Sequence, residues 1–128
     1  MSANKIAVGE HDAAHFTDEV FELIAERFKV MSEPMRLKIL HALIEGEMTV
    51  SQLVEKTAAG QANISKHLSK LLGAGMVGRR KAGLCVYYSI ADESILEHCE
   101  KICLGLGKHF AERHQAVQRF ADSRHSKR

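Results

Sequence analysis

Apolar residues recur every three or four positions over much of this chain, the spacing that places side chains on one face of a helix. A first amphipathic helix is predicted by the apolar positions between Phe16 and Phe28. The tripeptide Ser32-Glu33-Pro34 predicts the start of a second helix, with Ser32 as its cap and proline in the first turn, where its missing N–H is not needed. Apolar positions from Met35 to Ile44 line this helix, and Gly46 ends it.

The next segment carries the signals of two short helices joined by a turn. Thr49 and Gln52 fit a capping box, in which each side chain bonds to the other residue's backbone N–H. Ala58-Ala59-Gly60 predicts the turn. Beyond it, a fourth helix is predicted by an apolar stripe and is closed by glycines at 73 and 75; the stripe comprises Ile64, Leu68, Leu71 and Leu72. Two helices joined in this way predict a helix-turn-helix.

Residues 77–90 then predict a β-hairpin. Strands are expected at 77–81 and 84–90, with Ala82-Gly83 as a two-residue turn. Asp92 is expected to cap a last helix, in which apolar residues return at helical spacing: Ile95, Leu96, Cys99, Ile102, Cys103, Leu106 and Phe110. The predicted fold class is therefore mainly α with a small β-hairpin (α+β). Its order is four helices, two strands and one helix, which is a winged helix-turn-helix.

These elements divide the chain into three expected segments. Residues 1–14 form a flexible N-terminal arm, 15–112 a winged helix-turn-helix domain for DNA binding and dimerisation, and 113–128 a basic C-terminal tail. The apolar stripe on the last helix is too long and apolar to leave in water, so it is expected to be buried.

Composition limits the classes of protein to which the chain can belong. Its 128 residues are 45% hydrophobic and 27% charged, as in an ordinary soluble globular domain. No run approaches the ~18 apolar residues of a membrane span, and residues 1–10 lack a signal-peptide pattern, so we expect a cytoplasmic protein without a membrane partner. Three cysteines without an export signal are expected to be free thiols or ligands rather than a disulfide framework.

Charge is distributed unevenly along the chain. Net charge is only +2, yet residues 56–91 contain six lysine or arginine residues and no aspartate or glutamate. Residues 1–55 instead hold ten acids and five bases. A locally basic surface on a nearly neutral protein is typical of a site for a polyanion. Because this basic segment coincides with the helix-turn-helix and hairpin, the sequence predicts binding to double-stranded DNA.

The side chains of the fourth helix and hairpin suggest how DNA is contacted. Gln61 and Asn63 are of the types that pair with adenine in the major groove, and Ser65 and His67 can bond to bases or phosphates. Cations suited to the phosphate backbone or minor groove lie on the helix and hairpin: Lys66, Lys70, Arg79, Arg80 and Lys81. A merely solvated polar face is the alternative, and the missing acids argue against it.

Several motifs together resemble the ArsR/SmtB-type winged helix-turn-helix repressors. They are residues 33–40 (EPMRLKIL), 61–72 (QANISKHLSKLL), 73–77 (GAGMV) and 86–90 (VYYSI). The resemblance covers roughly residues 16–112 and implies a homodimer, joined through its terminal helices, that represses its target and releases DNA when an inducer binds. It places Gln61, Asn63, Ser65, Lys66 and His67 on the recognition helix. Such a dimer would read a palindromic operator.

The resemblance leaves the inducer open. The family's cysteine site before the recognition helix is absent, because residues 47–53 hold no cysteine. In its carboxylate-histidine site on the last helix, Asp92 matches but Ser94 and Gly105 stand where imidazoles are needed. His98, His109 and Glu112 keep a His-x10-His-x2-Glu spacing, displaced by about one turn, which leaves a weaker metal alternative.

Cysteines offer a second kind of sensor. Cys99 and Cys103 lie at i and i+4, too far apart for an unstrained bridge but suited to holding a soft metal or metalloid ion, with Cys85 or a partner chain supplying a third sulfur. Thiol oxidation or polysulfide formation is an alternative, and simple packing of cysteine as a small hydrophobe is another. No cofactor is expected to be required.

Other functions fit the sequence less well. An enzyme is not expected, because Cys99 and His98 are adjacent on a helix and do not face each other, and no glycine-rich phosphate loop is present. A constitutive winged-helix regulator without a ligand remains an alternative. So does a winged-helix interaction module that does not bind DNA, although such a module has no need to exclude acids.

Overall fold

The structure, a computed structural model, describes residues 16–126, so the arm expected at residues 1–14 lies outside the described residues. Thr17 begins α1 (Asp18–Met31), because its side chain accepts a hydrogen bond of 3.3 Å from the backbone N–H of Val20. Ser32 ends this helix, and its hydroxyl donates to the carbonyl of Lys29 at 2.7 Å. The prediction that Ser32 caps the second helix is therefore wrong, since its hydroxyl is committed to the helix before it.

Proline opens the next helix as predicted. α2 runs from Pro34 to Ala42 with Glu33 at the cap position, and a 3₁₀ turn, η3 (Leu43–Glu45), continues it. Gly46 ends this stretch with a φ of +139°, a conformation that side chains disfavour. The change to a tighter turn alters which side chains face inward. Leu43 is buried, whereas Ile44, expected on the apolar face, is half exposed to solvent.

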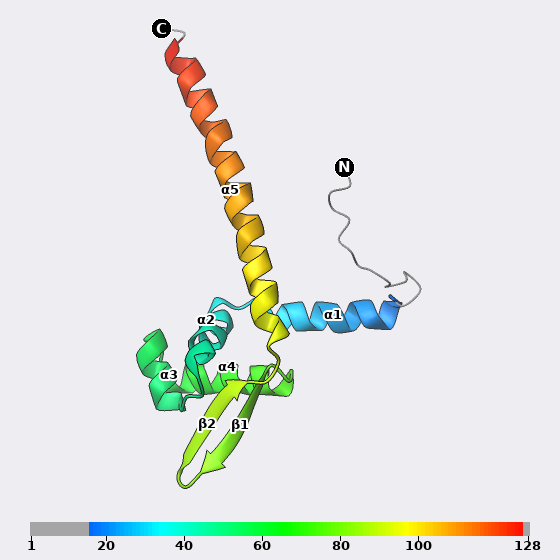
Figure 1. Ribbon diagram of the computed structural model, residues 1–128, viewed down its shortest axis with the longest axis vertical. Coiled ribbons are helices and arrows are strands. Elements are labelled where there is room, and N and C mark those ends of the chain that lie inside the picture. Colours follow the sequence, from blue (N-terminus) through cyan, green and yellow to red (C-terminus); the bar gives the residue numbers. More distant parts are fainter. Residues whose placement is uncertain (1–15, 127–128) are drawn as a thin grey trace. The chain divides into compact units, whose positions relative to one another are not determined.

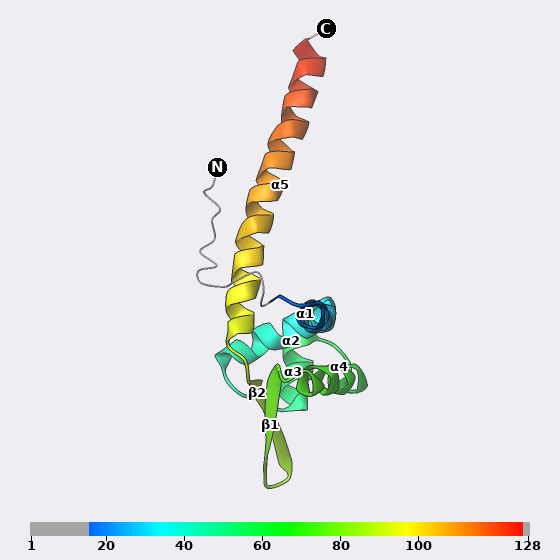
Figure 2. The same cartoon turned by 90° about the vertical axis from the view of Figure 1, so that its right-hand side faces the viewer.

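The predicted helix-turn-helix is present. The capping box of Thr49 and Gln52 starts α3 (Val50–Thr57), with bonds of 2.9 and 3.2 Å between each side chain and the other residue's backbone N–H. Ala58 takes a left-handed conformation in the turn, and α4 (Gln61–Gly73) follows. α2 packs against both α3 and α4, and α3 against α4. Figure 2 shows α4 beside the base of the hairpin.

Two antiparallel strands form the wing, β1 (Val77–Ala82) and β2 (Cys85–Ile90) (Figure 1). Ala82 pairs with Cys85, so the turn comprises Gly83 and Leu84, one residue later than predicted. Gly83 has a φ of +65°, which suits the first central position of a two-residue hairpin turn. The turn is therefore Gly83-Leu84 rather than Ala82-Gly83, because this places glycine at the first central position.

The helices and the base of the wing share one core. Its fully buried large side chains come from α2, α3, α4 and the start of the wing: Ile39, Leu40, Leu53, Ile64, Leu68, Leu71 and Met76. Backbone bonds of 2.8 and 3.0 Å join Met48 to Tyr88 and tie the segment before α3 to β2. The mainly helical winged helix-turn-helix fold is confirmed in residues 16–91.

The last helix, α5 (Ser94–Ser126), is described by itself. The Asp92 carboxylate accepts a bond of 3.0 Å from the backbone N–H of Ser94, the first residue of the helix. The helix is 33 residues long and crosses position 113, where a basic tail was expected to begin, without a break. Large apolar side chains lie exposed along it, including Ile102, Leu106, Phe110 and Phe120. Of the helices described, none is long and apolar enough to cross a membrane.

Candidate nucleic-acid interface

α4 has one buried face and one exposed polar face. Ile64, Leu68 and Leu71 are essentially inaccessible to solvent and fix the rotation of the helix in the core. This rotation leaves a set of predicted DNA-contacting residues exposed, as expected: Gln61, Asn63, Ser65, Lys66 and Lys70. Gly60 occupies the cap position without a side chain, so the first turn of α4 is not covered by a capping residue.

His67 does not belong to the exposed set. Its side chain is only 8% exposed, and its Nδ1 accepts a hydrogen bond of 3.2 Å from Nε of Arg36 on α2. The prediction that His67 lies on the exposed polar face is therefore wrong. Position 67 lies three residues after Ile64 and four before Leu71, so helical spacing places it with the core stripe.

The three wing cations differ in their surroundings. Arg79, Arg80 and Lys81 are all exposed on β1, but successive side chains of a strand point to opposite faces. Arg80 shares its face with Tyr87, its partner across the ladder, and its guanidinium lies 4.8 Å from the centroid of that ring. Within residues 16–126, the side chains of Arg79 and Lys81 make no hydrogen bond or ion pair.

Arg80 is bound by Glu47, which lies in the segment before α3. The Glu47 Oε2 accepts a bond of 2.9 Å from Nε of Arg80, and its Oε1 pairs with Nη2. This hydrogen bond lowers the pKa of the Glu47 carboxyl and raises that of Arg80. Sequence reasoning did not find Glu47, because the two residues are 33 positions apart and no local pattern links them.

The candidate sensor cysteines are free thiols. Cys103 and Cys85 are exposed and Cys99 is partly buried. Cys99 and Cys103 lie one turn apart on α5, whereas Cys85 begins β2. In the described part of one chain, no group of three or more histidine, cysteine or acidic residues is placed to hold a metal ion. His98, His109 and Glu112 therefore do not form such a group within one chain.

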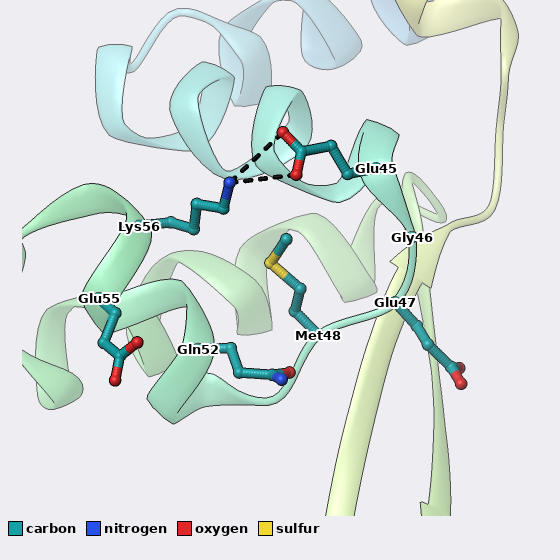
Figure 3. A pocket seen from close by; sticks show the side chains of 7 residues that line it. All are labelled: Glu45, Gly46, Glu47, Met48, Gln52, Glu55 and Lys56. Carbon is teal, nitrogen blue, oxygen red and sulfur yellow. Dashed lines mark hydrogen bonds and ion pairs between the residues drawn. The ribbon is translucent and has the colours of Figure 1, made fainter.

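A hollow of about 460 Å³ lies beside the start of α3 (Figure 3). Met48 and Gln52 contribute to its lining, and at one side Lys56 Nζ pairs with Glu45 at 3.1 Å. Figure 3 shows the Glu47 side chain directed away from Met48, on the side of the hairpin. None of the predicted DNA-contacting or sensor residues lines this hollow.

The match to a protein family falls on the helix-turn-helix and the start of the wing. The family described as "Bacterial regulatory protein, arsR family" matches residues 33–78. An uncharacterized HTH-type transcriptional regulator of Methanocaldococcus jannaschii is 40% identical over 80 residues, which span 62% of this chain and 90% of that protein. The chain belongs to the arsR family. The predicted resemblance is therefore confirmed, and this arsR-family chain is a DNA-binding transcriptional regulator rather than an enzyme.

For two further curated relatives, the match with this chain spans a smaller share of the relative's length. The nodulation protein NolR of Rhizobium meliloti is 36% identical over 59% of this chain and 62% of NolR, so the match spans less than two thirds of that relative. A homolog of the cadmium resistance transcriptional regulatory protein CadC, from Staphylococcus aureus, is 37% identical over 63% of this chain and 68% of its own.

Solved structures share the fold. The crystal structure of Mycobacterium tuberculosis Rv0081 superposes with a TM-score of 0.69 at 31% identity and covers 76% of this chain and 98% of its own. The solution structure of a homodimeric winged helix-turn-helix DNA-binding domain, Mb0332 from Mycobacterium bovis, has a TM-score of 0.64 at 25% identity, with 80% and 93% covered.

Proposed function

We propose that this chain acts as a homodimeric repressor that inserts α4 into the major groove of a palindromic operator. The observation that carries the proposal is the exposed polar face of α4, which continues into a basic wing without a single acidic residue between positions 56 and 91. A helix with short amide and hydroxyl groups flanked by cations has the chemistry that base edges and phosphates require.

Individual roles follow from side-chain type and exposure. Gln61 and Asn63 are proposed to pair with adenine, and Ser65 to bond to a base or phosphate. Lys66 and Lys70 are proposed as phosphate contacts on the helix, with Arg79 and Lys81 on the wing. His67 is left out, because its Nδ1 is engaged by Arg36 and its side chain is buried.

Dimerisation is proposed because each terminal helix exposes apolar side chains. On α1, Phe21, Leu23 and Phe28 are each more than half exposed, and α5 exposes Phe110 and Phe120 to a similar degree. Such surfaces cost free energy in water and are typical of subunit contacts. The related Mb0332 domain is homodimeric. Two copies would present two recognition helices about one DNA turn apart.

The test is fluorescence anisotropy of the protein on its own promoter DNA over a range of salt concentrations. We expect Lys66→Gln to weaken binding and to reduce the slope of log K against log salt by about 0.9, because one phosphate contact is lost. Lys101→Gln, an exposed lysine on α5, is the matched control and should change neither quantity. Affinity that does not fall with salt would favour a protein-interaction module without DNA.

The proposed inducer site is the pair Cys99 and Cys103. The two thiols share one face of α5, and a soft metal or metalloid ion held by them would take a third sulfur from a second copy or from Cys85. The relation to a CadC homolog supports a thiophilic ion as inducer. Oxidants or sulfur donors that link the thiols are the alternative chemistry.

This site is tested by titrating the protein–DNA complex with arsenite, zinc, cadmium and a polysulfide donor. A coupling of usual size would lower DNA affinity about 5- to 150-fold. Cys99→Ser and Cys103→Ser should keep DNA binding but lose this response, and Cys85→Ser shows whether the third sulfur comes from the wing. A response that survives in both α5 variants places the sensor elsewhere. Release by zinc alone would favour His98, His109 and Glu112, and no release by any of the four would favour a constitutive regulator.

A further inference from the structure

Arg80 is surrounded differently from the other wing cations. Both carboxylate oxygens of Glu47 engage its guanidinium, and the Tyr87 ring lies beneath it. A two-pronged pair of this kind fixes the direction of an arginine side chain as well as its charge. The acid also neutralises the cation, so Arg80 adds little to the positive field of the wing.

The contact between Arg80 and Glu47 spans the width of the hairpin. Met48 bridges to Tyr88 on β2, and β2 pairs with β1, so the segment before α3 lies along the outer edge of β2. Arg80 reaches from β1 over Tyr87 to Glu47 on the far side of β2. One side-chain contact therefore joins the far strand of the wing to the residues that lead into the helix-turn-helix.

An isolated two-stranded hairpin is marginally stable, so its orientation depends on such ties. At its base the wing is held by backbone bonds from Met48 to Tyr88 and from Ala91 to Met76. From Lys81 to Cys85, the turn end of the hairpin, all side chains are exposed. Next to this end, the Glu47–Arg80 contact joins the hairpin to the segment before α3 through side chains.

We propose that Glu47 and Arg80 are positioning residues for DNA binding: they form a clasp that sets the orientation of the wing, and Arg80 does not itself contact phosphate. This inference rests on the proposed DNA-binding function. It changes the role of Arg80 from a predicted phosphate contact to a residue that positions the wing. Under this proposal, Arg79 and Lys81 supply the phosphate contacts of the wing, because no acid of the described chain engages them.

The test compares Arg80→Gln, Glu47→Gln and the double variant by DNA-binding anisotropy at several salt concentrations. Each single variant should weaken binding about two- to fivefold, the range expected for an exposed ion pair, without changing the salt slope. The double variant should be no weaker than either single variant, because both remove the same contact. Arg79→Gln is the matched control, and it should reduce the slope by about 0.9.

A charge swap gives the sharper discrimination. Arg80→Glu alone should weaken binding, and adding Glu47→Arg should restore it, because the clasp is rebuilt in reverse. A slope reduced by about 0.9 in Arg80→Gln, with unchanged or tighter binding in Glu47→Gln, would show a phosphate contact and overturn the clasp. Wild-type protein that does not bind its promoter would instead overturn the proposed function, and the role of the clasp with it.

Hydrogen exchange of the free protein provides a readout that needs no DNA. Glu47→Gln and Arg80→Gln should each speed exchange of the backbone amides near the turn of the wing to the same extent, whereas Arg79→Gln should not. Unchanged exchange in both clasp variants would contradict the proposal even if DNA binding were altered.

Discussion

Nε of Arg36 donates a hydrogen bond of 3.2 Å to Nδ1 of His67, joining the second helix to the buried side of the recognition helix. The same guanidinium donates from Nη1 to the carbonyl of Val30, near the end of α1, at 3.0 Å. Since Nδ1 accepts in this arrangement, it carries no hydrogen, and a neutral ring bears its hydrogen on Nε2. One arginine thus fixes three helices at a point close to the proposed DNA-binding face.

Removing this guanidinium should destabilise the fold. Arg36→Met keeps most of the apolar stem but leaves His67 Nδ1 and the Val30 carbonyl without their donor. We expect the free energy of unfolding to fall by about 1–3 kcal/mol, as for other partly buried groups that lose a charged partner. Urea unfolding followed by circular dichroism measures it. Lys38→Met, on an exposed position of the same helix, is the control, and equal effects of the two changes would contradict the assignment.

The capping box predicts a second effect. Thr49→Ala removes the hydroxyl that accepts from the backbone N–H of Gln52, so α3 should lose about 1 kcal/mol of stability. Because α3 has only eight residues, the loss should also speed amide exchange in its first turn. Ser51→Ala lies two residues further on, at an exposed position, and should have little effect. A loss as large in Ser51→Ala would point to helix propensity rather than capping.

Gly73, the last residue of α4, and Gly75, just beyond it, should respond oppositely to alanine. Gly75 has a φ of +74°, so Gly75→Ala should cost about 1–2 kcal/mol through backbone strain. Gly73 ends the helix without such a φ, and a Cβ there would meet no atom within 4 Å. Gly73→Ala should therefore be neutral or stabilise by up to about 1 kcal/mol. Thermal unfolding of both variants tests this, and a destabilised Gly73→Ala protein would contradict it.

The ion pair of Glu47 with Arg80 predicts a defined pH response. The hydrogen bond from Arg80 holds the pKa of Glu47 below its ordinary value of 4.5. A lowered pKa means that this carboxylate stabilises the fold above the ordinary value and loses the effect as pH falls through the lowered one. The difference in unfolding free energy between wild type and Glu47→Gln should thus be constant above about pH 5 and shrink in more acid solution.

A carboxyl titration by NMR checks this prediction directly. The Glu47 side chain should titrate below 4.5 in the wild-type protein and near its ordinary value in Arg80→Gln. An unperturbed Glu47 in wild-type protein would mean that the ion pair does not persist in solution.

Local sequence patterns were enough to predict the order of helices and strands, the capping box and most of the exposed face of α4. These features are encoded within a few neighbouring residues: apolar spacing sets each helix face, and Thr49 with Gln52 sets one helix start. The acid-free stretch from 56 to 91 is likewise a property of the sequence, so the sequence located the proposed DNA-binding segment, although not the role of every side chain in it.

Features that depend on residues far apart in the chain could not be predicted in this way. Helical spacing places His67 with the core stripe, but only the packing of α4 on α2 brings its ring to Arg36, 31 positions away. Arg80 resembles its neighbours in sequence, and only the antiparallel pairing of the wing with the Met48 segment brings Glu47 within reach. Such contacts arise from the way elements pack, which local periodicity and charge do not encode.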